Sequence, residues 1–323
     1  MALVEAFRGI LPAMQVPYRE DFTIDERELR RFARWLAGHQ GIGGLVTNGH
    51  TGEVFALSRE ERAEVTRIVS SEVGGQVPVI SGICSENMTE AAEHARMARD
   101  AGAAGLLVMP PHYWLRFGMA PEHVLDHFTA VGEAARINLV VHVYPSWTKA
   151  MYSSDLLARL VKLPWVTTVK IGTRELSKYD RDLAAIRAAN PAATVLTCHD
   201  EYLLATMVQG VDGALVGFAS FIPELVTGLY AAVCDGDLRR AQEIQRRING
   251  LKAVVYAEGE PSGDAHARMK TAMMLAGRFR SNRTRPPIRV PSGAMLERIR
   301  KAVVEAQLAP AAGLEEAGTS TTA

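Results

Sequence analysis

The segment Thr167-Thr168-Val169-Lys170-Ile171-Gly172 places a lysine inside an apolar run. Side chains alternate between the two faces of a strand, so Thr168 and Lys170 would share one face and Val169 and Ile171 the other. A lysine that is buried without a partner has a lowered pKa, and its neutral amine can attack a carbonyl carbon and form a Schiff base. The alternative is a lysine that reaches solvent at the strand end or pairs with a carboxylate.

Seven other short apolar runs accompany this segment, with helical patterns between them. Their spacing is typical of the successive strand–helix units of a barrel of about 250 residues. The regular alternation favours a closed parallel (β/α)8 TIM barrel over an open doubly wound sheet, so the fold class is α/β. The expected strands are 9–16, 43–47, 77–81, 105–109, 139–144, 166–171, 194–197 and 213–217.

The helices between the strands have recognisable starts. Thr23, Ser58 and Asn87 each stand three residues ahead of a glutamate, a pattern that satisfies the first free N–H groups of a helix. The strands stop after residue 235, which predicts a barrel over 1–235. A C-terminal helical region over 236–308 would follow, with helices at 238–256, 265–276 and 293–305. The small polar tail 309–323 is expected to be disordered.

Composition limits the possible partners and location. Lysine plus arginine and aspartate plus glutamate both number 36 in the 323 residues, so no basic excess suggests nucleic acid. The cysteines Cys84, Cys198 and Cys234 have no metal-ribbon or disulfide spacing. No apolar run approaches the roughly 18 residues of a membrane span, and the start lacks a cleavable leader pattern. We expect a cytoplasmic protein whose partners are small molecules or copies of itself, without membrane or nucleic acid.

The second expected strand runs into Asn48-Gly49-His50-Thr51-Gly52-Glu53. Glycines on both sides of His50 and Thr51 allow a tight turn that aims backbone N–H groups at one point, which suits a carboxylate. The alternative is an ordinary strand-to-helix turn that binds nothing. In a barrel of this kind, the loops after the strands surround the active site, so this turn and Lys170 would face the same space.

The fifth expected strand carries His142 and Tyr144 on one face. Both rings would point into the barrel mouth beside Lys170, where a phenol or an imidazole could transfer protons to and from a carbinolamine. Packing in the core or at the rim is the alternative for either ring.

Four motifs together resemble, in order and spacing, the dihydrodipicolinate synthase / N-acetylneuraminate lyase family. They are GHTGE after strand two, Pro-Pro-His-Tyr after strand four, aromatic-Pro-Ser after strand five and Val-Lys-Ile-Gly on strand six. The resemblance extends from about Arg8 to the C-terminal helices and implies a Schiff-base (β/α)8 lyase that acts on pyruvate or another 2-oxo acid. It implies that Lys170 forms the Schiff base and that Tyr113 is a relay tyrosine reaching across a dimer interface. It also implies a keto-acid site formed by His50, Thr51, Gly52, Leu215 and Gly217, and a homo-oligomer, dimer or tetramer.

Two departures from the family pattern affect the expected chemistry. His50 stands where the family usually has a second threonine, and His142 stands where its proton-transferring tyrosine is usual. Tyr144, two residues later, could substitute for that tyrosine, and we slightly favour it over His142. Trp147 stands where a true dihydrodipicolinate synthase usually has an arginine after Pro-Ser, which also argues against that enzyme. The chain is more similar to the sugar-acid dehydratase and aldolase branches.

Three hypotheses follow for function. The first is a carbon–carbon or carbon–oxygen lyase in which Lys170 supplies covalent electron withdrawal, so that no metal or organic cofactor is needed. The second is a 2-oxo-acid-binding protein without catalysis. The third is a metal-assisted barrel hydrolase or aldolase that uses His199, Asp200 and Glu201. For these three residues we favour a hydrogen-bond network at the barrel rim, or contacts to substrate hydroxyls, over metal binding. The pair His123 and His127, four residues apart on a helix, is interpreted as solvated helix surface.

Overall fold

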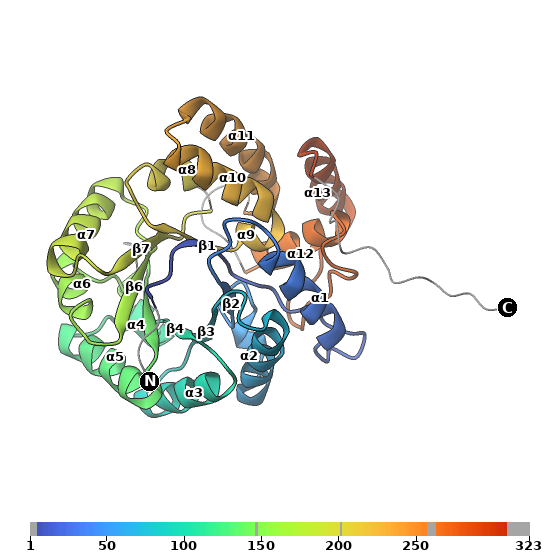
Figure 1. The fold of residues 1–323 in the computed structure, drawn as a ribbon. Coiled ribbons are helices and arrows are strands. Elements are labelled where there is room, and N and C mark those ends of the chain that lie inside the picture. The colour runs from blue at the N-terminus through green and yellow to red at the C-terminus, as the bar shows by residue number, and fades with distance from the viewer. Residues whose placement is uncertain (1–4, 146–147, 201, 257–262, 309–323) are drawn as a thin grey trace.

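The computed structural model describes residues 5–145, 148–200, 202–256 and 263–308, and these form a parallel barrel (Figure 1). Hydrogen-bonded strands follow the order β1-β8-β7-β6-β5-β4-β3-β2. Isolated bridges from Ile10 to Ile42 and from Ala13 to Val46 close the gap between β1 and β2. The strands are β1 (Gly9–Pro12), β2 (Leu45–Thr47), β3 (Val79–Ile83), β4 (Gly105–Val108), β5 (Asn138–Val143), β6 (Val166–Ile171), β7 (Thr194–Thr197) and β8 (Gly213–Val216).

Helices surround the strands on the outside of the barrel (Figure 1). They are α1 (Glu26–Ala37), η1 (Val54–Ala56), α2 (Arg59–Val73), α3 (Met88–Asp100), α4 (His112–Phe117), α5 (Pro121–Ala135), α6 (Ser154–Leu160), α7 (Leu176–Ala189), α8 (Leu203–Met207), α9 (Phe218–Phe221) and α10 (Pro223–Cys234). The predicted TIM barrel is confirmed, with strand bounds within a few residues of those expected. The short helices η1, α4 and α9 were not predicted.

Two of the three expected helix starts are correct. Ser58 and Glu61 form a reciprocal capping box at α2, and the Asn87 side chain accepts from the N–H of Glu90 at α3. The expectation for Thr23 is wrong. Asp25 caps α1 by accepting from Glu28, because the Thr23 hydroxyl already donates to Asp21 at 2.6 Å.

The two faces of each strand pack differently, as the alternation predicts. The outward residues Val169 and Ile171 pack against the surrounding helices. A separate apolar cluster fills the barrel interior and includes Phe7, Leu11, Val46, Ile80, Leu107, Val140, Leu196 and Leu215. A Cβ on Gly105 would lie 2.5 Å from the Phe7 ring, so a larger residue there would displace this side chain. The barrel is therefore a packed core with free space only beyond its apolar layer.

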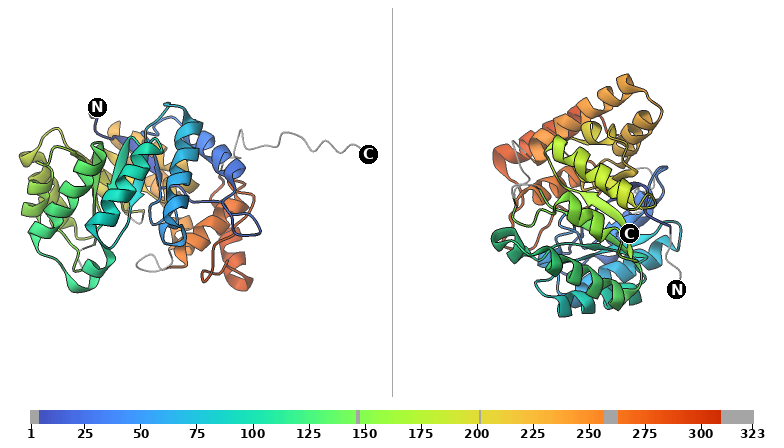
Figure 2. Two further views of the ribbon diagram at one scale, coloured as in Figure 1. Left: turned by 90° about the horizontal axis from the view of Figure 1, so that it is seen from below. Right: turned by 90° about the vertical axis from the view of Figure 1, so that its left-hand side faces the viewer.

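Three helices follow the barrel: α11 (Leu238–Val255), α12 (Ala265–Leu275) and α13 (Gly293–Glu305). They gather on one side of the barrel, where α11 packs on α10, α12 packs on α9, and α13 packs on α11 and α12 (Figure 2). Their bounds agree with the helices expected for 236–308. The separation of the chain at residue 235 stays a prediction, and the tail 309–323 lies outside the described residues.

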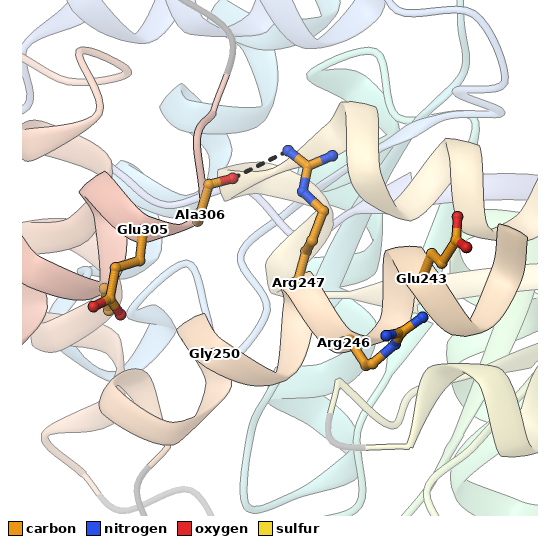
Figure 3. A pocket seen from close by; sticks show the side chains of 7 residues that line it. Glu243, Arg246, Arg247, Gly250, Glu305 and Ala306 are labelled. Carbon is orange, nitrogen blue, oxygen red and sulfur yellow. Dashed lines mark hydrogen bonds between the residues drawn. The ribbon is translucent and has the colours of Figure 1, made fainter.

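A hollow of about 570 Å³ lies between α11 and α13 (Figure 3). Arg247 of α11 reaches across it and donates to the backbone oxygen of Ala306 at 3.0 Å. This contact joins the two helices. None of the helices in the described ranges combines the length and the apolar character that crossing a bilayer requires.

Candidate active site

A cavity of about 750 Å³ opens at the C-terminal end of the barrel strands. This is the end at which barrel enzymes carry their active sites. The cavity brings together residues from the strands β5, β6 and β8, from the segments that follow every strand except β3, and from the C-terminal helices. Its polar lining includes His50, Thr51, Glu53, His112, His142, Tyr144, Thr148, Lys170, Arg174, Asp200 and His266.

Lys170 lies on β6 between His142 of β5 and Leu196 of β7, which are its register partners in the sheet. Its side chain lines the cavity and is partly buried. Within the described ranges, no hydrogen bond or ion pair occupies its amine. Gly172 follows closely, and a Cβ there would lie 2.2 Å from the carbonyl oxygen of Val143, so the chain can turn beside the lysine only with glycine. The amine thus faces open space.

Tyr144 and His50 are joined by a hydrogen bond across the cavity wall. The Tyr144 hydroxyl lies 2.8 Å from Nε2 of His50. Burial raises the pKa of Tyr144 well above its usual value, so the phenol keeps its proton and donates it. Burial, and after it the neighbouring Lys170, His112 and His266, lowers the pKa of His50 to about 3. The His50 ring is therefore neutral and accepts the bond through Nε2.

His142 stands beside this pair. Its ring meets Tyr144 edge to face, with centroids 4.8 Å apart and planes at 87°. Burial and the nearby charge of Lys170 lower the pKa of His142 well below its usual value, so the ring is neutral. Its Nδ1 is buried without a hydrogen-bond partner. The structure therefore brings both proton-transfer candidates, His142 and Tyr144, into the cavity of Lys170.

The expected keto-acid residues meet at the same cavity, with one exception. His50, Thr51, Leu215 and Gly217 line it. A Cβ on Gly217 would lie 3.0 Å from Oγ1 of Thr51, which shows how closely the loops after β2 and β8 approach each other. Gly52 does not belong to the described lining. A Cβ there would lie 2.9 Å from the Met14 oxygen, so this glycine allows the loop to pack against β1.

Tyr113 lies outside the cavity of its own chain. It stands on α4, is 47% exposed and contacts the ring of Trp114 edge to face. Its neighbour His112 lines the cavity instead. Glu86 holds His112 in place, because its Oε1 lies 3.0 Å from the backbone N of His112 and 3.1 Å from Nδ1. The position of Tyr113 leaves its ring available to a second copy of the chain.

The metal hypothesis finds no support in the geometry of Asp200. Its carboxylate accepts from the backbone N–H groups of Gly217 at 3.2 Å and Phe218 at 3.1 Å, and from the Tyr256 hydroxyl at 2.5 Å. His199 packs against Tyr179 and is not part of the described lining. Glu201 lies outside the described residues. Among the residues that are described, no three histidine, cysteine, aspartate or glutamate side chains are grouped to hold a metal ion.

The interpretation of His127 as solvated surface is wrong. The ring is 1% exposed and packs edge to face against Trp114 and Phe128. Its helical partner His123 is exposed, as expected. The helical spacing gave no indication that one of the two imidazoles faces the core, because α4 folds back over α5 and covers it.

Two histidines of the cavity were missed in the sequence, as were Thr148 and Arg174. His112 was quoted only as part of a motif, and His266 was not singled out. The motif position after β4 could have indicated His112. No local signal indicates His266, because it comes from α12, far along the chain from the strands that it faces.

A closed parallel barrel whose cavity holds an unpaired lysine is the architecture of a TIM-barrel enzyme. Comparison with known proteins gives the family. The model of the Dihydrodipicolinate synthetase family matches residues 6–306. The chain therefore belongs to the dihydrodipicolinate synthetase family, and it is an aldolase-type lyase.

Individual relatives agree with this assignment. A protein named 4-hydroxy-tetrahydrodipicolinate synthase from Maridesulfovibrio salexigens is 31% identical over 303 residues, covering 94% of this chain and 97% of its own. An uncharacterized DapA-like lyase from Thermofilum pendens is 32% identical over 273 residues, covering 84% and 88%. The crystal structure of a chloride-inhibited dihydrodipicolinate synthase from Acinetobacter baumannii, complexed with pyruvate, has a TM-score of 0.82 at 25% identity. It covers 94% of this chain and all 100% of that one.

Proposed function

We propose that this protein is a Schiff-base lyase that acts on pyruvate or another 2-oxo acid, with Lys170 as the nucleophile. The observation that carries the proposal is the position of Lys170, whose amine faces a cavity of about 750 Å³ without an ion-pair partner in the described ranges. An amine in this setting can add to a ketone carbon, and the covalent adduct withdraws electrons as a cofactor would.

The first stage forms the iminium. The carboxylate of the keto acid rests on the loop that carries His50 and Thr51, and the Lys170 amine adds to C2 to give a carbinolamine. Tyr144 donates a proton to the departing hydroxyl, which leaves as water. The phenolate that remains takes up the next proton that the substrate releases, which restores the Tyr144 hydroxyl and its hydrogen bond to His50. His142 is the second candidate for this transfer.

The second stage breaks a bond next to the iminium. In cleavage, a base takes the proton of the C4 hydroxyl, the C3–C4 bond breaks into the iminium, and an aldehyde leaves while an enamine stays on Lys170. In dehydration, the C3 proton leaves first to give the enamine, which then expels the protonated C4 hydroxyl as water and becomes an unsaturated iminium. Proton return to the enamine and addition of water to the iminium then release the product and free Lys170. The residues of this chain supply the nucleophile and the proton carriers for either outcome.

The substrate that we propose is a 2-keto-3-deoxy sugar acid. His50 and His142 occupy positions at which the family usually has threonine and tyrosine, which supports chemistry other than that of a true synthase. The names of the relatives favour a second candidate, formation of 4-hydroxy-tetrahydrodipicolinate. An assay for that product, run beside one for cleavage of sugar-acid substrates, separates the two. The third indication, Trp147, lies outside the described residues.

The decisive experiment traps the adduct. Incubation with pyruvate and sodium borohydride, followed by peptide mass spectrometry, is expected to place a reduced pyruvate adduct on Lys170. The Lys170→Ala variant should remain unlabelled, while Lys149→Ala, which removes an exposed lysine, should be labelled as in wild type. A wild-type protein without an adduct would contradict the proposal. Turnover abolished by EDTA and unaffected by borohydride would favour the metal hypothesis.

An adduct without turnover would identify a 2-oxo-acid-binding protein instead of an enzyme. A broad panel of 2-oxo acids tests this, because an active lyase consumes at least one of them while a binding protein consumes none. We also propose a homo-oligomer in which Tyr113 reaches the cavity of a second copy. Sedimentation measurements on wild type and on Tyr113→Asp, which places a charge on this exposed position, test the contact.

A further inference from the structure

His266 lies in the C-terminal helical region and yet lines the cavity of Lys170. It is the second residue of α12 (Ala265–Leu275), so one wall of the cavity comes from outside the barrel. Lys270 is four residues further along, and residues with this spacing share one face of a helix. This face of α12 is turned toward the barrel mouth.

Three contacts fix the first turns of α12 against the barrel. Lys270 is fully buried and pairs with Glu53, which itself lines the cavity, and it donates to the backbone oxygen of Val16 at 2.9 Å. The side-chain amide of Gln15 donates to the backbone oxygen of His266 at 3.0 Å. A side chain held by buried contacts of this kind has a defined position, which recognition of a substrate group requires.

The chemistry of the His266 ring narrows what it can bind. Burial and the charge of Lys270 lower the pKa of His266 to about 4, so the ring is neutral near pH 7. A neutral imidazole has one N–H donor and one acceptor nitrogen, which match a hydroxyl group and lack the charge that would attract a carboxylate. Nδ1 is buried without a hydrogen-bond partner, whereas Nε2 is not shielded in this way. The ring therefore has unused hydrogen-bonding capacity toward the cavity.

The position of His266 relative to the reacting centre is also informative. It lies near His50 but comes from α12, on the side of the cavity formed outside the barrel, and not from the loop that carries His50 and Thr51. The keto-acid end of a substrate bonded to Lys170 would lie on the His50–Thr51 loop. A group that meets His266 then belongs to the part of the substrate chain that extends away from the keto acid.

We propose that His266 is a specificity-determining residue that hydrogen-bonds a hydroxyl group on the substrate chain beyond C3. The inference rests on the proposed Schiff-base function and deepens it, since it assigns a polyhydroxylated chain to the substrate. A cavity built to bond a hydroxyl discriminates strongly against an analogue that lacks it, because the polar group of the protein is then left unpaired.

The test compares two aldehydes of equal length in condensation with pyruvate: glyceraldehyde, which carries two hydroxyls, and propanal, which carries none. Wild-type enzyme is expected to have a kcat/KM for glyceraldehyde about tenfold or more above that for propanal. His266→Phe should lower the glyceraldehyde value about tenfold and leave the propanal value nearly unchanged. His266→Asn, which keeps a donor and an acceptor, should recover part of the loss. His123→Phe, which alters an exposed imidazole on α5, is the control.

Borohydride trapping of pyruvate on Lys170 is run on the same samples. Trapping at the wild-type level in His266→Phe, with the preference between aldehydes lost, supports the inference. A wild-type enzyme that forms the adduct but prefers propanal, or that accepts neither aldehyde, overturns it, as does an equal loss for both aldehydes in His266→Phe. If the wild-type protein forms no adduct, the proposed function itself is contradicted. This result therefore differs from a failure of the inference about His266 alone.

Discussion

The phenolic oxygen of Tyr144 and Nε2 of His50 are the two atoms that best explain how this cavity could transfer protons. Burial acts on them in opposite directions, because it raises the pKa of the phenol and lowers that of the imidazole, and both changes keep the pair neutral. The neutral Tyr144 phenol, bonded to the neutral His50 ring, can therefore donate a proton in the cavity of Lys170 without adding a charge to that cavity. His142 has a neutral ring as well, but within the described ranges it has no hydrogen-bonded partner that could return its proton.

Replacement of Tyr144 by phenylalanine tests this preference. We expect Tyr144→Phe to lower kcat by about 10²-fold to 10⁴-fold, the range typical of a lost general acid, and His142→Asn to lower it less. Steady-state kinetics on the identified substrate measure both. Tyr152→Phe is the matched control, because Tyr152 is also fully buried and its hydroxyl has no hydrogen-bond partner. A larger loss in His142→Asn than in Tyr144→Phe would assign the proton to His142.

At the scale of elements, the cavity depends on loops and helices that approach one another closely. The turn after β8 approaches the loop after β2 at Gly217, and Asp200 accepts from two N–H groups at the start of α9. In the same loop after β2, Glu53 beside η1 meets Lys270 of α12. Burial raises the pKa of Glu53 and lowers that of Lys270 although the two are in contact, so their desolvation outweighs their attraction.

Gly217→Ala is expected to increase KM for the 2-oxo acid and to lower the free energy of unfolding by about 1 to 3 kcal/mol, because the added methyl crowds Thr51 and Asp200. Kinetics and urea unfolding measure the two effects. Gly228→Ala is the control. Gly228 lies within α10, and a Cβ there would be 3.6 Å from the Ile244 side chain, an ordinary van der Waals contact. We therefore expect Gly228→Ala to raise the free energy of unfolding by up to about 1 kcal/mol. An unchanged KM in Gly217→Ala would show that this approach does not shape the keto-acid site.

Lys270→Met leaves the Glu53 carboxylate buried without its partner, and we expect a loss of about 3 to 5 kcal/mol in the free energy of unfolding. The double variant Glu53→Gln with Lys270→Met should recover much of this loss, since no buried charge remains. Urea unfolding of both single variants and the double variant gives the coupling energy. Additive losses would indicate that the two residues stabilise the fold independently.

At the scale of the whole molecule, buried neutral histidines make the free energy of unfolding depend on pH. Burial lowers the pKa of His127 to about 4 from 6.5, and the same direction holds for His50, His142 and His266. At a pH between the folded pKa of each ring and 6.5, the unfolded chain binds a proton on that histidine and the folded chain does not. The stability contributed by each neutral ring is therefore complete above pH 6.5 and is lost as the pH falls toward the folded pKa, by up to about 1.4 kcal/mol per pH unit and ring.

His127→Phe removes one of these rings from a site away from the cavity. The variant should therefore lose less stability than wild type between pH 7 and pH 5, while its stability at pH 7 stays equal or higher because two unbonded ring nitrogens are gone. Urea unfolding at both pH values measures the difference. His123→Gln on the same helix is the control. An unchanged pH dependence in His127→Phe would contradict the assignment.

The sequence was sufficient for the barrel, because the alternation of short apolar runs with capped helices repeats eight times and the register of each strand follows from its inward and outward residues. It also placed Lys170, His142 and Tyr144 on inward faces, since two-residue periodicity decides this locally. His266 depends on a helix that returns from a distant part of the chain, and the buried His127 depends on how Trp114 of the preceding helix packs against it. No local pattern encodes these contacts. The partners of Asp200 could not be predicted for the same reason, because they follow β8 and the end of α11.

The pairing of Lys270 with Glu53 joins residues 217 positions apart. During synthesis the strands of the barrel leave the ribosome well before α12 does, and domains generally fold as their chains emerge. A nascent chain that has completed all eight strands still lacks the helix that covers one side of Lys170. The cavity around Lys170 would therefore be complete only near the end of translation.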